Sequence, residues 1–384
     1  MRLAMVSETW APDINGVAHT LHQLSQALIQ RGVTLQLIRP RPFQPGNAAG
    51  MEHELQVTGF RAPTYPDVRL GMPARKALTR LWREAPPDAI YIATEGPLGW
   101  AALNLARRLG IPAVSGFHTN FDHYAGDYGL CWLEAPIRAT LRYFHNRSQA
   151  TLVPTEQRAA ELREAGFKRV RVMGRGIDAE HFGPHKRDIE LRRRWGVGAH
   201  QPVALHVGRI AQEKNLDLLV ETFTAMQAVQ PDLQPLVVGD GPQRAALEKR
   251  LPGTIFTGFI DNESLARHYA SADLFVFPSR SETYGNVVAE AMASGLGIVA
   301  FDYAAAAMLI DHDRNGLKAD FHDSAAFVAH AAALCRNSAQ TAWLGRAARQ
   351  RVERQAWSRV ADDFLATLLQ VQETAHGKPY SAGI

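Results

Sequence analysis

The chain has 384 residues, of which 46% are hydrophobic and 21% charged, and its formal net charge is +4. This composition is typical of a soluble globular protein and excludes a disordered or fibrous one, while the length predicts two domains. Cys131 and Cys335 lie far apart without C-x-x-C spacing, which argues against a disulfide framework or a structural zinc site and predicts a cytoplasmic location.

The start of the chain predicts a strand and no secretory signal, because its apolar run meets Ser7 and Glu8 too early. No uninterrupted apolar run approaches the roughly 20 residues that are needed to cross a bilayer. Residues 1–180 hold 21 Lys/Arg against 16 Asp/Glu, so this basic half could face anionic lipid. Neither a Lys/Arg-rich run nor a recognition motif is present, and we expect no nucleic-acid partner.

Short β-rich runs alternate with helical patterns along the chain, which is typical of parallel sheets covered by helices on both faces. The first series predicts strands at Leu3–Val6, Leu35–Ile38, Ala89–Ile92, Ala113–Ser115 and Leu152–Pro154, with helices such as Val17–Gln30 and Leu98–Arg108. The second series predicts strands at Val203–Val207, Leu236–Val238, Ile255–Gly258, Leu274–Pro278 and Ile298–Phe301.

Two such series predict two Rossmann-like domains, over residues 1–178 and 199–357. The polar stretch Asp178–His200 between them, with Gly, Pro and mixed charge, predicts a linker with a short helix. A last helix, over residues 358–376, is predicted to pack back on the first domain. The helical pattern itself runs over Gln355–Gln372, and its apolar stripe comprises Trp357, Val360, Phe364, Leu365 and Leu368.

The strongest functional signal is the segment of residues 281–295, SETYGNVVAEAMASG, which follows a buried-type strand. Glu282 is expected on the loop between strand and helix, at the sheet edge where open α/β folds bind ligands. The amides of Gly285, Asn286 and Val287 would open the helix and point at an anion such as a diphosphate. Glu290, on the second turn, could reach ribose hydroxyls; the structural alternative is a surface carboxylate on an ordinary helix.

The E-x7-E spacing within SRSETYGNVVAEAMASGLGIVA resembles the donor-site signature of the retaining glycosyltransferases of family four. Trp10–Val17, WAPDINGV, resembles the family's glycine-containing loop after the first strand. FHTNFDHY, residues 117–124, is similar to a segment of bacterial GDP-mannose-dependent α-mannosyltransferases and related glycolipid-forming enzymes. HVGRIAQEKN, VVGDGP, TGFI and LFVFPSRSET follow in the family's order, so the resemblance covers nearly the whole chain.

The resemblance implies the GT-B fold, an α/β architecture of two Rossmann-like domains with a deep cleft between them. It implies that Arg209 and Lys214 bind the donor diphosphate, a role that suits two cations. Gly16 would allow backbone to approach the phosphates closely. The implied catalytic residues are Glu282, which would hold the 3- or 4-hydroxyl of the transferred sugar, and His118, which would orient a sugar hydroxyl.

The other implied donor contacts come from the same motifs. Besides Glu282, the sugar or ribose would meet Thr283, Tyr284 and Glu290, and the base would lie near Gly239, Asp240, Gly241, Phe259 and Ile260. Where the family usually has Gly or Glu, this chain has YAAAAM at residues 303–308, which leaves the sugar contacts of that loop open.

The predicted reaction is transfer of a hexosyl group, first of all mannose from GDP-mannose, to a lipid or glycan acceptor. Transfer of glucose or glucuronic acid from a UDP-sugar to diacylglycerol is the alternative. No further carboxylate is placed as a nucleophile, so the family expectation is retention by same-face attack. A nucleotide-sugar epimerase would need additional acid–base residues, and a sugar-binding protein is the rival from another class.

No cofactor is expected, because the nucleotide-sugar is a substrate. Asp311-His312-Asp313 is a D-x-D sequence, but its polar setting, DHDRNGL, predicts a surface turn without a metal. A Mg²⁺ requirement stays open, since the sequence offers no identified ligand set.

The segment Ala74–Ala85 is predicted to be a helix with two different faces. One face carries Arg75, Lys76, Arg80 and Arg83, and the other carries Leu78, Leu81 and Trp82. Such a helix could lie on anionic lipid at the inner face of the membrane, or it could pack on the sheet as an ordinary helix.

Overall fold

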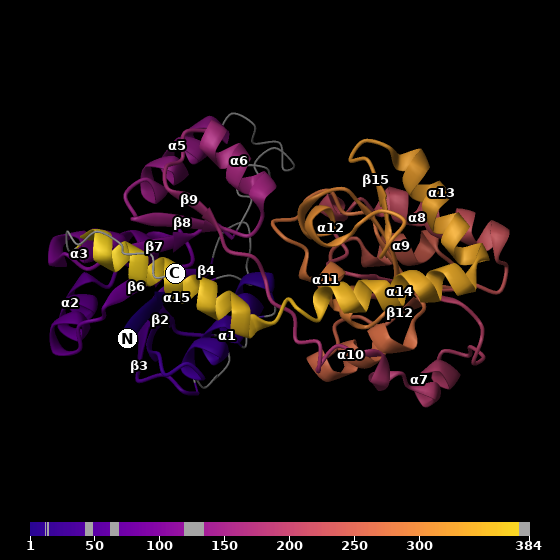
Figure 1. The fold of residues 1–384 in the computed structure, drawn as a ribbon, viewed down its shortest axis with the longest axis horizontal. Helices are drawn as coiled ribbons and strands as arrows, with labels where there is room; N and C mark the ends of the chain where they lie inside the picture. Colours follow the sequence, from indigo (N-terminus) through magenta and orange to yellow (C-terminus); the bar gives the residue numbers. More distant parts are fainter. Residues whose placement is uncertain (12, 14, 43–48, 62–68, 119–133, 376–384) are drawn as a thin grey trace, which may run out of the picture. The chain divides into compact units, whose positions relative to one another are not determined.

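The computed structural model describes the chain except for residues 12, 14, 43–48, 62–68, 119–133 and 376–384. Two compact units make up the chain. The first contains Met1–Arg175 and Trp357–Ile384, and the second contains Gly176–Ala356. Each unit is a parallel sheet covered by helices, the α/β architecture that the alternating sequence pattern predicts (Figure 1).

The first unit contains a seven-stranded parallel sheet with the order β3-β2-β1-β6-β7-β8-β9. Its strands are β1 (Arg2–Val6), β2 (Thr34–Pro40), β3 (His53–Val57), β6 (Ala89–Ile92), β7 (Ala113–Gly116), β8 (Ala150–Val153) and β9 (Val170–Val172). A separate antiparallel pair consists of β4 (Gly59–Arg61) and β5 (Arg69–Gly71). The chain order reverses between β1 and β6, and ligands bind at such a switch point in open parallel sheets.

Helices cover both faces of this sheet (Figure 1). They are α1 (Gly16–Ile29), α2 (Arg75–Glu84), α3 (Pro97–Leu109), α5 (Glu134–His145), α6 (Glu156–Glu164) and α15 (Trp357–Ala375). Apolar residues of α1 and α15 share one core with β1, β2 and β6. Apolar residues of α2 and α3 share a second core with the other side of the same strands.

The helix α15 brings the end of the chain back to the first unit, beside α1 (Figure 1). Its apolar stripe is buried, and the ring of Phe364 meets Tyr91 of β6 edge to face at a centroid distance of 5.1 Å. Arg31, just after α1, forms an ion pair with Asp362 of α15. Residues far apart in the sequence therefore complete the first core, and Arg31 and Asp362 are 331 positions apart.

Replacing Phe364 with alanine should destabilise the first unit by about 3–5 kcal/mol, because Phe364 is fully buried and the helix cannot fill the space. Denaturant unfolding followed by circular dichroism measures this loss. The control is Leu369→Ala on the same helix, whose side chain is 51% exposed. Equal destabilisation by both substitutions would contradict the proposed packing of α15.

The second unit contains a six-stranded parallel sheet with the order β12-β11-β10-β13-β14-β15. Its strands are β10 (Val203–Val207), β11 (Gln234–Val238), β12 (Ile255–Phe256), β13 (Leu274–Phe277), β14 (Gly297–Phe301) and β15 (Leu317–Ala319). Its helices are η2 (Pro184–Lys186), α7 (Ile189–Arg194), η3 (Gln212–Lys214), α8 (Leu216–Val229), α9 (Arg244–Arg250), α10 (Asn262–Ser271), α11 (Asn286–Ala293), α12 (Ala304–Leu309), α13 (Ser324–Arg336) and α14 (Ser338–Val352). The chain order reverses between β10 and β13.

The stretch predicted as a linker, residues 178–200, belongs to the second unit. Its helix α7 is anchored by Arg192, which is 2% exposed and donates to the carboxylate of Asp273 and to the carbonyls of Ser271, Gly198 and Gln201. Most of the charged residues of the stretch are exposed, and the buried hydrogen bonds of Arg192 attach it to the second unit.

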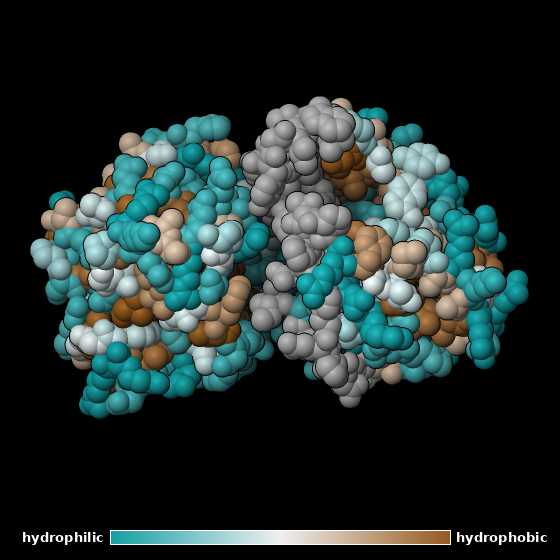
Figure 2. Space-filling model, turned by 180° about the vertical axis from the view of Figure 1, so that it is seen from behind, coloured by the Kyte–Doolittle hydropathy of each residue, from teal (hydrophilic) through white to brown (hydrophobic). Residues whose placement is uncertain are grey.

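The described helices include none that is both long enough and apolar enough to span a membrane. Hydrophilic residues cover most of the face drawn in Figure 2, and the hydrophobic residues on it occur in small groups.

Candidate functional site

The switch point of the second sheet brings together the residues that the sequence motifs single out. Arg209 and Lys214 lie on the loop that follows β10, and Glu282 lies on the loop that follows β13. Since β10 and β13 are adjacent and parallel, both loops leave the same edge of the sheet. The two predicted cations and the predicted sugar-binding carboxylate therefore belong to neighbouring loops.

Lys214 and Glu282 are in direct contact. The Lys214 ammonium nitrogen lies 2.5 Å from Oε1 of Glu282, and each side chain is 15% exposed. The same Oε1 accepts a hydrogen bond from the Ser279 hydroxyl at 2.7 Å. Oε2 of Glu282 has no hydrogen-bond partner among the described residues, so the carboxylate is fixed through one oxygen while the other is available to a hydroxyl.

Asn215 holds the two loops in register. It adopts a left-handed conformation with φ of 55°, and its amide nitrogen donates to the carbonyl of Pro278 at 3.1 Å. This bond ties the residue after Lys214 to the residue after β13, which positions Lys214 toward Glu282. The role of Asn215 could not be predicted from the sequence, because its contact joins residues 63 positions apart.

Arg209 is more accessible than Lys214. Its side chain is 44% exposed, and its guanidinium lies 3.3 Å from Oε1 of Glu213, which is 4% exposed. A planar guanidinium at the rim of the site can bind two phosphate oxygens at once, whereas Lys214 offers a point charge deeper in the loop.

The helix α11 begins directly after this loop. Gly285 is its N-cap, with φ of 88°, a conformation that favours glycine, and no side chain caps the helix. The first amides, of Asn286 and Val287, lie at the positive end of the helix, which suits an anion. Thr283 is half-buried, but Tyr284 is buried in the core, and its carbonyl accepts from Ala305. Any sugar contact of Tyr284 would therefore involve backbone.

Glu290 is buried on the inner face of α11, where its Oε2 accepts a hydrogen bond from the Tyr269 hydroxyl at 3.0 Å. Burial raises the pKa of Glu290 to about 7, although the Tyr269 hydrogen bond lowers it. The predicted ribose contact thus concerns a carboxyl that already has an internal partner. The sequence could not show this partner, because Tyr269 lies on α10.

Glutamine at position 290 should make the stability of the second unit less sensitive to pH. The pKa of Glu290 is higher in the folded state than the ordinary value of 4.5, so folding favours the protonated carboxyl. Stability should fall as pH rises from about 4.5 to 7, by up to about 3 kcal/mol, and then stay low. In thermal unfolding, Glu290→Gln should have a higher midpoint temperature than wild type at pH 8 but not at pH 4.5. The control is Glu221→Gln at an exposed position, which should leave the pH dependence of stability unchanged. An unchanged pH dependence in Glu290→Gln would contradict the burial of the Glu290 carboxyl.

The loop after β11 contains Gly239, Asp240 and Gly241. An added Cβ at Gly239 would lie 2.0 Å from the carbonyl oxygen of Gly208, and one at Gly241 would lie 2.3 Å from that of Ile210. Both glycines are therefore required by the close packing of two loops, independently of any nucleotide. Asp240 accepts from the Gly241 amide, which lowers its pKa, and from Arg244.

The residues predicted near the base differ in exposure. Phe259 is 65% exposed, immediately after Gly258, which forms a bridge with Gly239. Ile260 is half-buried and packs against the core. Phe259 is thus the predicted base contact whose ring is accessible for stacking.

His206 on β10 is a further residue near this site that the sequence analysis missed. It is fully buried, its Nδ1 lies 3.0 Å from the carbonyl of Val276, and its Nε2 has no partner among the described residues. Because the carbonyl can only accept, Nδ1 carries the proton and Nε2 presents a bare lone pair. Burial and the charge of Lys214 lower the pKa of His206 to about 4, while the bond to Val276 raises it.

Gly16 and His118 belong to the first unit. Gly16 is the exposed first residue of α1, whose N-cap Asn15 accepts from the amides of Val17 and Ala18. His118 follows β7 and is buried; residues 119–124 of the FHTNFDHY motif lie outside the described residues.

Both ring nitrogens of His118 have partners. Nδ1 lies 2.6 Å from the Arg175 guanidinium, and Nε2 lies 2.6 Å from the Tyr91 hydroxyl. Since the guanidinium can only donate, Nδ1 accepts and Nε2 carries the proton. Burial, together with the positive charge of Arg175, holds the pKa of His118 well below 6.5. His118 is therefore neutral, and a sugar hydroxyl would have to replace a present partner.

The D-x-D sequence forms an exposed turn. Asn315 accepts from the amide of Asp311, and Asp313 is left-handed with φ of 60°. Throughout the described part of the chain, no three His, Cys, Asp or Glu side chains are grouped so that they could hold a metal ion.

Comparison with known proteins now identifies the family. Residues 14–181 match the model of Glycosyltransferase Family 4, and residues 201–337 match Glycosyl transferases group 1. The chain belongs to the family four glycosyltransferases. It is therefore a hexosyltransferase, as the E-x7-E motif predicts, and family membership favours this class over the epimerase and the sugar-binding protein.

Individual relatives agree with this assignment. The chain is 33% identical to a GDP-mannose-dependent alpha-mannosyltransferase of Mycolicibacterium smegmatis, over 95% of this chain and 96% of the relative. It is 26% identical to an alpha-monoglucosyldiacylglycerol synthase of Acholeplasma laidlawii, over 78% of this chain and 80% of the relative. The structure resembles that of a sucrose-phosphate synthase from Thermosynechococcus elongatus, with a TM-score of 0.79 at 20% identity, covering 97% and 99% of the two chains. The GT-B prediction is thereby confirmed.

Proposed function

We propose that this glycosyltransferase moves a mannosyl group from GDP-mannose to a lipid or glycan acceptor in the cytoplasm, with retention of the anomeric configuration. The observation that carries the choice of donor is the 33% identity to a named GDP-mannose-dependent mannosyltransferase along 95% of the chain. The relative named as a monoglucosyldiacylglycerol synthase supports a lipid acceptor and makes a glucosyl group the second candidate for transfer, for which the donor would be a UDP-sugar.

The donor site of the proposal lies at the switch point of the second sheet. Arg209, Lys214 and the first amides of α11 would neutralise the diphosphate. Oε2 of Glu282 would accept a hydrogen bond from the 3- or 4-hydroxyl of the sugar, since its Oε1 already has two donors. Phe259 would stack on the base, and a ribose hydroxyl would have to compete with Tyr269 for the buried carboxyl of Glu290.

The proposed chemistry needs no protein nucleophile. The bond between the anomeric carbon and the diphosphate oxygen breaks, and the acceptor oxygen bonds to the same face of that carbon. The acceptor proton passes to the departing phosphate oxygen, while the cations stabilise the charge that develops there. Glu282 is held by Lys214 and Ser279 as a binding group, which agrees with this role. We further propose that EDTA leaves transfer unchanged.

Product analysis tests this proposal. The enzyme is incubated with GDP-mannose or UDP-glucose, with EDTA present or absent, and with either diacylglycerol vesicles or a soluble glycan. NMR then reads the anomeric configuration of the product. An α-linked product made from GDP-mannose is expected. An inverted anomer would contradict the proposed mechanism. Exclusive use of UDP-glucose would show that GDP-mannose is not the donor.

We also propose that the exposed basic face of α2 contacts anionic membrane lipid. Leu78 and Trp82 are buried in the first unit's own core, so only the charged face remains for the lipid. Binding would therefore be electrostatic and would weaken with salt.

Replacing Lys76, Arg80 and Arg83 with glutamate should abolish flotation with phosphatidylserine vesicles at low salt, because the contact is electrostatic. Reversing two exposed charges of the second unit, Arg336 and Arg346, provides the control. Flotation that persists after reversal on α2 would remove the membrane proposal and leave the transferase intact.

A further inference from the structure

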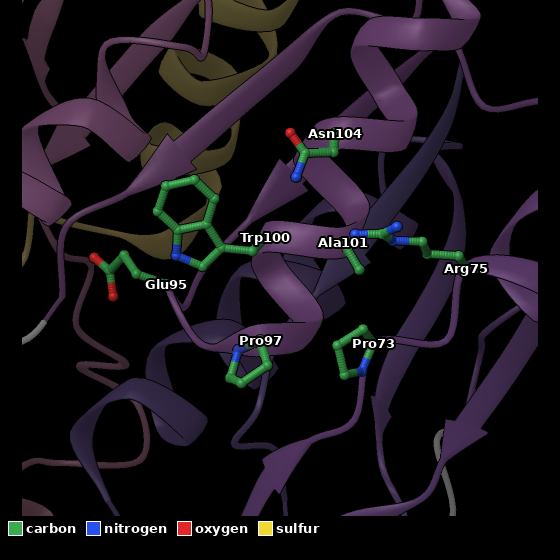
Figure 3. Close-up of a pocket in the computed structure, with 7 residues that line it drawn as sticks. All are labelled: Pro73, Arg75, Glu95, Pro97, Trp100, Ala101 and Asn104. Atoms are coloured by element: carbon green, nitrogen blue, oxygen red, sulfur yellow. The ribbon is translucent and has the colours of Figure 1, made fainter.

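The first unit contains a cavity of about 430 Å³ between the start of α2 and the first turns of α3 (Figure 3). Its volume is within the range of about 300–1,000 Å³ that is typical of small-molecule sites. It opens beside the loop that follows β6, at the switch point of the first sheet. The residues that line it include Pro73, Arg75, Glu95, Pro97, Trp100 and Asn104.

Trp100 provides a fixed aromatic surface in this cavity. Its indole stacks on the ring of Tyr143 at a centroid distance of 6.0 Å and an angle of 21°, and it meets the ring of Phe144 edge to face at a centroid distance of 5.0 Å. Tyr143 is itself 58% exposed, so the two stacked rings form a platform that reaches the surface. Aromatic platforms of this kind suit ligands that have an apolar face and polar edges.

The carboxylate of Glu95 is held in place by buried residues of the first unit. Its Oε1 lies 3.0 Å from Nε2 of His145, a fully buried residue, and Nδ1 of His145 lies 2.8 Å from the Ser115 hydroxyl. The described residues provide no hydrogen-bond partner for Oε2 of Glu95. One oxygen is therefore anchored by an internal chain of hydrogen bonds, and the other can accept from a ligand hydroxyl.

Asn104 has the complementary character. Its Oδ1 accepts a hydrogen bond from Arg147 at 2.8 Å, and the same arginine donates to the Tyr143 hydroxyl at 2.8 Å. The amide group of Asn104 therefore keeps its two donors for a ligand. Arg75, at the start of α2, is exposed, and no described carboxylate lies within ion-pair distance of it.

We propose that this cavity binds a hexopyranose unit of the acceptor, which rests on the proposed transferase function. A pyranose ring presents C–H groups on its face and hydroxyls around its edge. Trp100 fits the face, Oε2 of Glu95 accepts from one hydroxyl, and the amide of Asn104 and the guanidinium of Arg75 donate to others. The enzyme would then prefer an acceptor that already carries a sugar over bare diacylglycerol.

The test measures the KM for a monoglycosyl diacylglycerol, for diacylglycerol and for the nucleotide-sugar separately. Trp100→Ala should raise the KM for the glycosylated acceptor about tenfold, the magnitude of a lost aromatic contact, without changing the other two constants. Trp100→Phe should restore much of the loss. Saturation-transfer NMR with methyl α-D-mannopyranoside and methyl α-D-glucopyranoside should show binding to wild type that Trp100→Ala abolishes.

Two further variants separate binding from folding. Arg75→Ala changes an exposed side chain and should also raise the KM for the glycosylated acceptor. Trp343→Ala, at a 51% exposed tryptophan of the second unit, should change nothing. The pocket proposal is overturned if Trp100→Ala and Arg75→Ala leave that KM unchanged, or if wild type prefers bare diacylglycerol. Absence of donor turnover in wild type would instead refute the proposed function.

Discussion

Glu282→Gln is expected to lower kcat/KM for sugar transfer by about 100-fold while leaving the affinity for the free nucleoside diphosphate nearly unchanged. Glutamine keeps the shape of the side chain but replaces a charged acceptor by a neutral amide. The amide oxygen can still accept from the Lys214 ammonium, which lies 2.5 Å from Oε1 in the wild type. Because the free nucleotide carries no sugar, the loss should be confined to the complete donor. Steady-state transfer assays together with calorimetry on the nucleotide measure both quantities.

The matched control is Glu221→Gln, which removes one charge from an exposed position on α8. It should retain the wild-type kcat/KM. Retention of full activity by Glu282→Gln would show that this carboxylate does not bind the sugar. An equal loss of nucleotide affinity would instead place Glu282 in a structural role, through Lys214 and Ser279.

Arg209→Ala should weaken the binding of a nucleoside diphosphate by about 10- to 100-fold, because a charge-assisted pair with phosphate is lost. The binding of the corresponding monophosphate should change much less. Arg209 suits this test because its side chain is 44% exposed, so its removal should not disturb the core. Arg209→Lys keeps the charge but not the two-pronged geometry, and it should fall between wild type and alanine.

Isothermal titration of GDP, GMP, UDP and UMP with the wild type and these variants gives the required ratios. An equal loss of affinity for the diphosphates and the monophosphates would show that Arg209 does not contact the second phosphate. Unchanged binding of all four nucleotides would remove Arg209 from the donor site.

The structure has a strand at each predicted position, and most of these strands are buried along their whole length. Runs such as Val203–Val207 and Leu274–Phe277 are apolar along their whole length, as strands in the middle of a parallel sheet are. The missed strands β3, β9 and β15 are three of the four outer strands of the two sheets, and β4 and β5 form a separate pair. Their residues are partly exposed and polar, as in HELQV of β3, so they carry a weaker apolar signal.

The site residues on strand-to-helix loops were accessible to sequence analysis for a similar reason. Arg209, Lys214 and Glu282 each follow an unmistakable buried strand, and parallel strands end at a common edge. The residues that fix them were not accessible. Asn215 and Ser279 act on this loop pair through side-chain contacts. Tyr269 in the same way holds Glu290, and the protonation of His206 depends on the carbonyl of Val276.

Local backbone strain was also outside the reach of sequence analysis. In the YAAAAM segment, where the family usually has Gly or Glu, Ala304 adopts a left-handed conformation with φ of 52°. A non-glycine residue pays for this conformation, and such positions occur preferentially at functional sites. The nearby amide of Ala305 bonds to the carbonyl of Tyr284, which connects this loop to the Glu282 segment.

The most direct test of the account is calorimetric titration of wild type with GDP-mannose, UDP-glucose, GDP and UDP. The account predicts saturable binding of one nucleotide-sugar together with its own nucleoside diphosphate, with GDP-mannose as the expected ligand. Binding of neither nucleotide-sugar would contradict the donor site that is placed at the switch point of the second sheet.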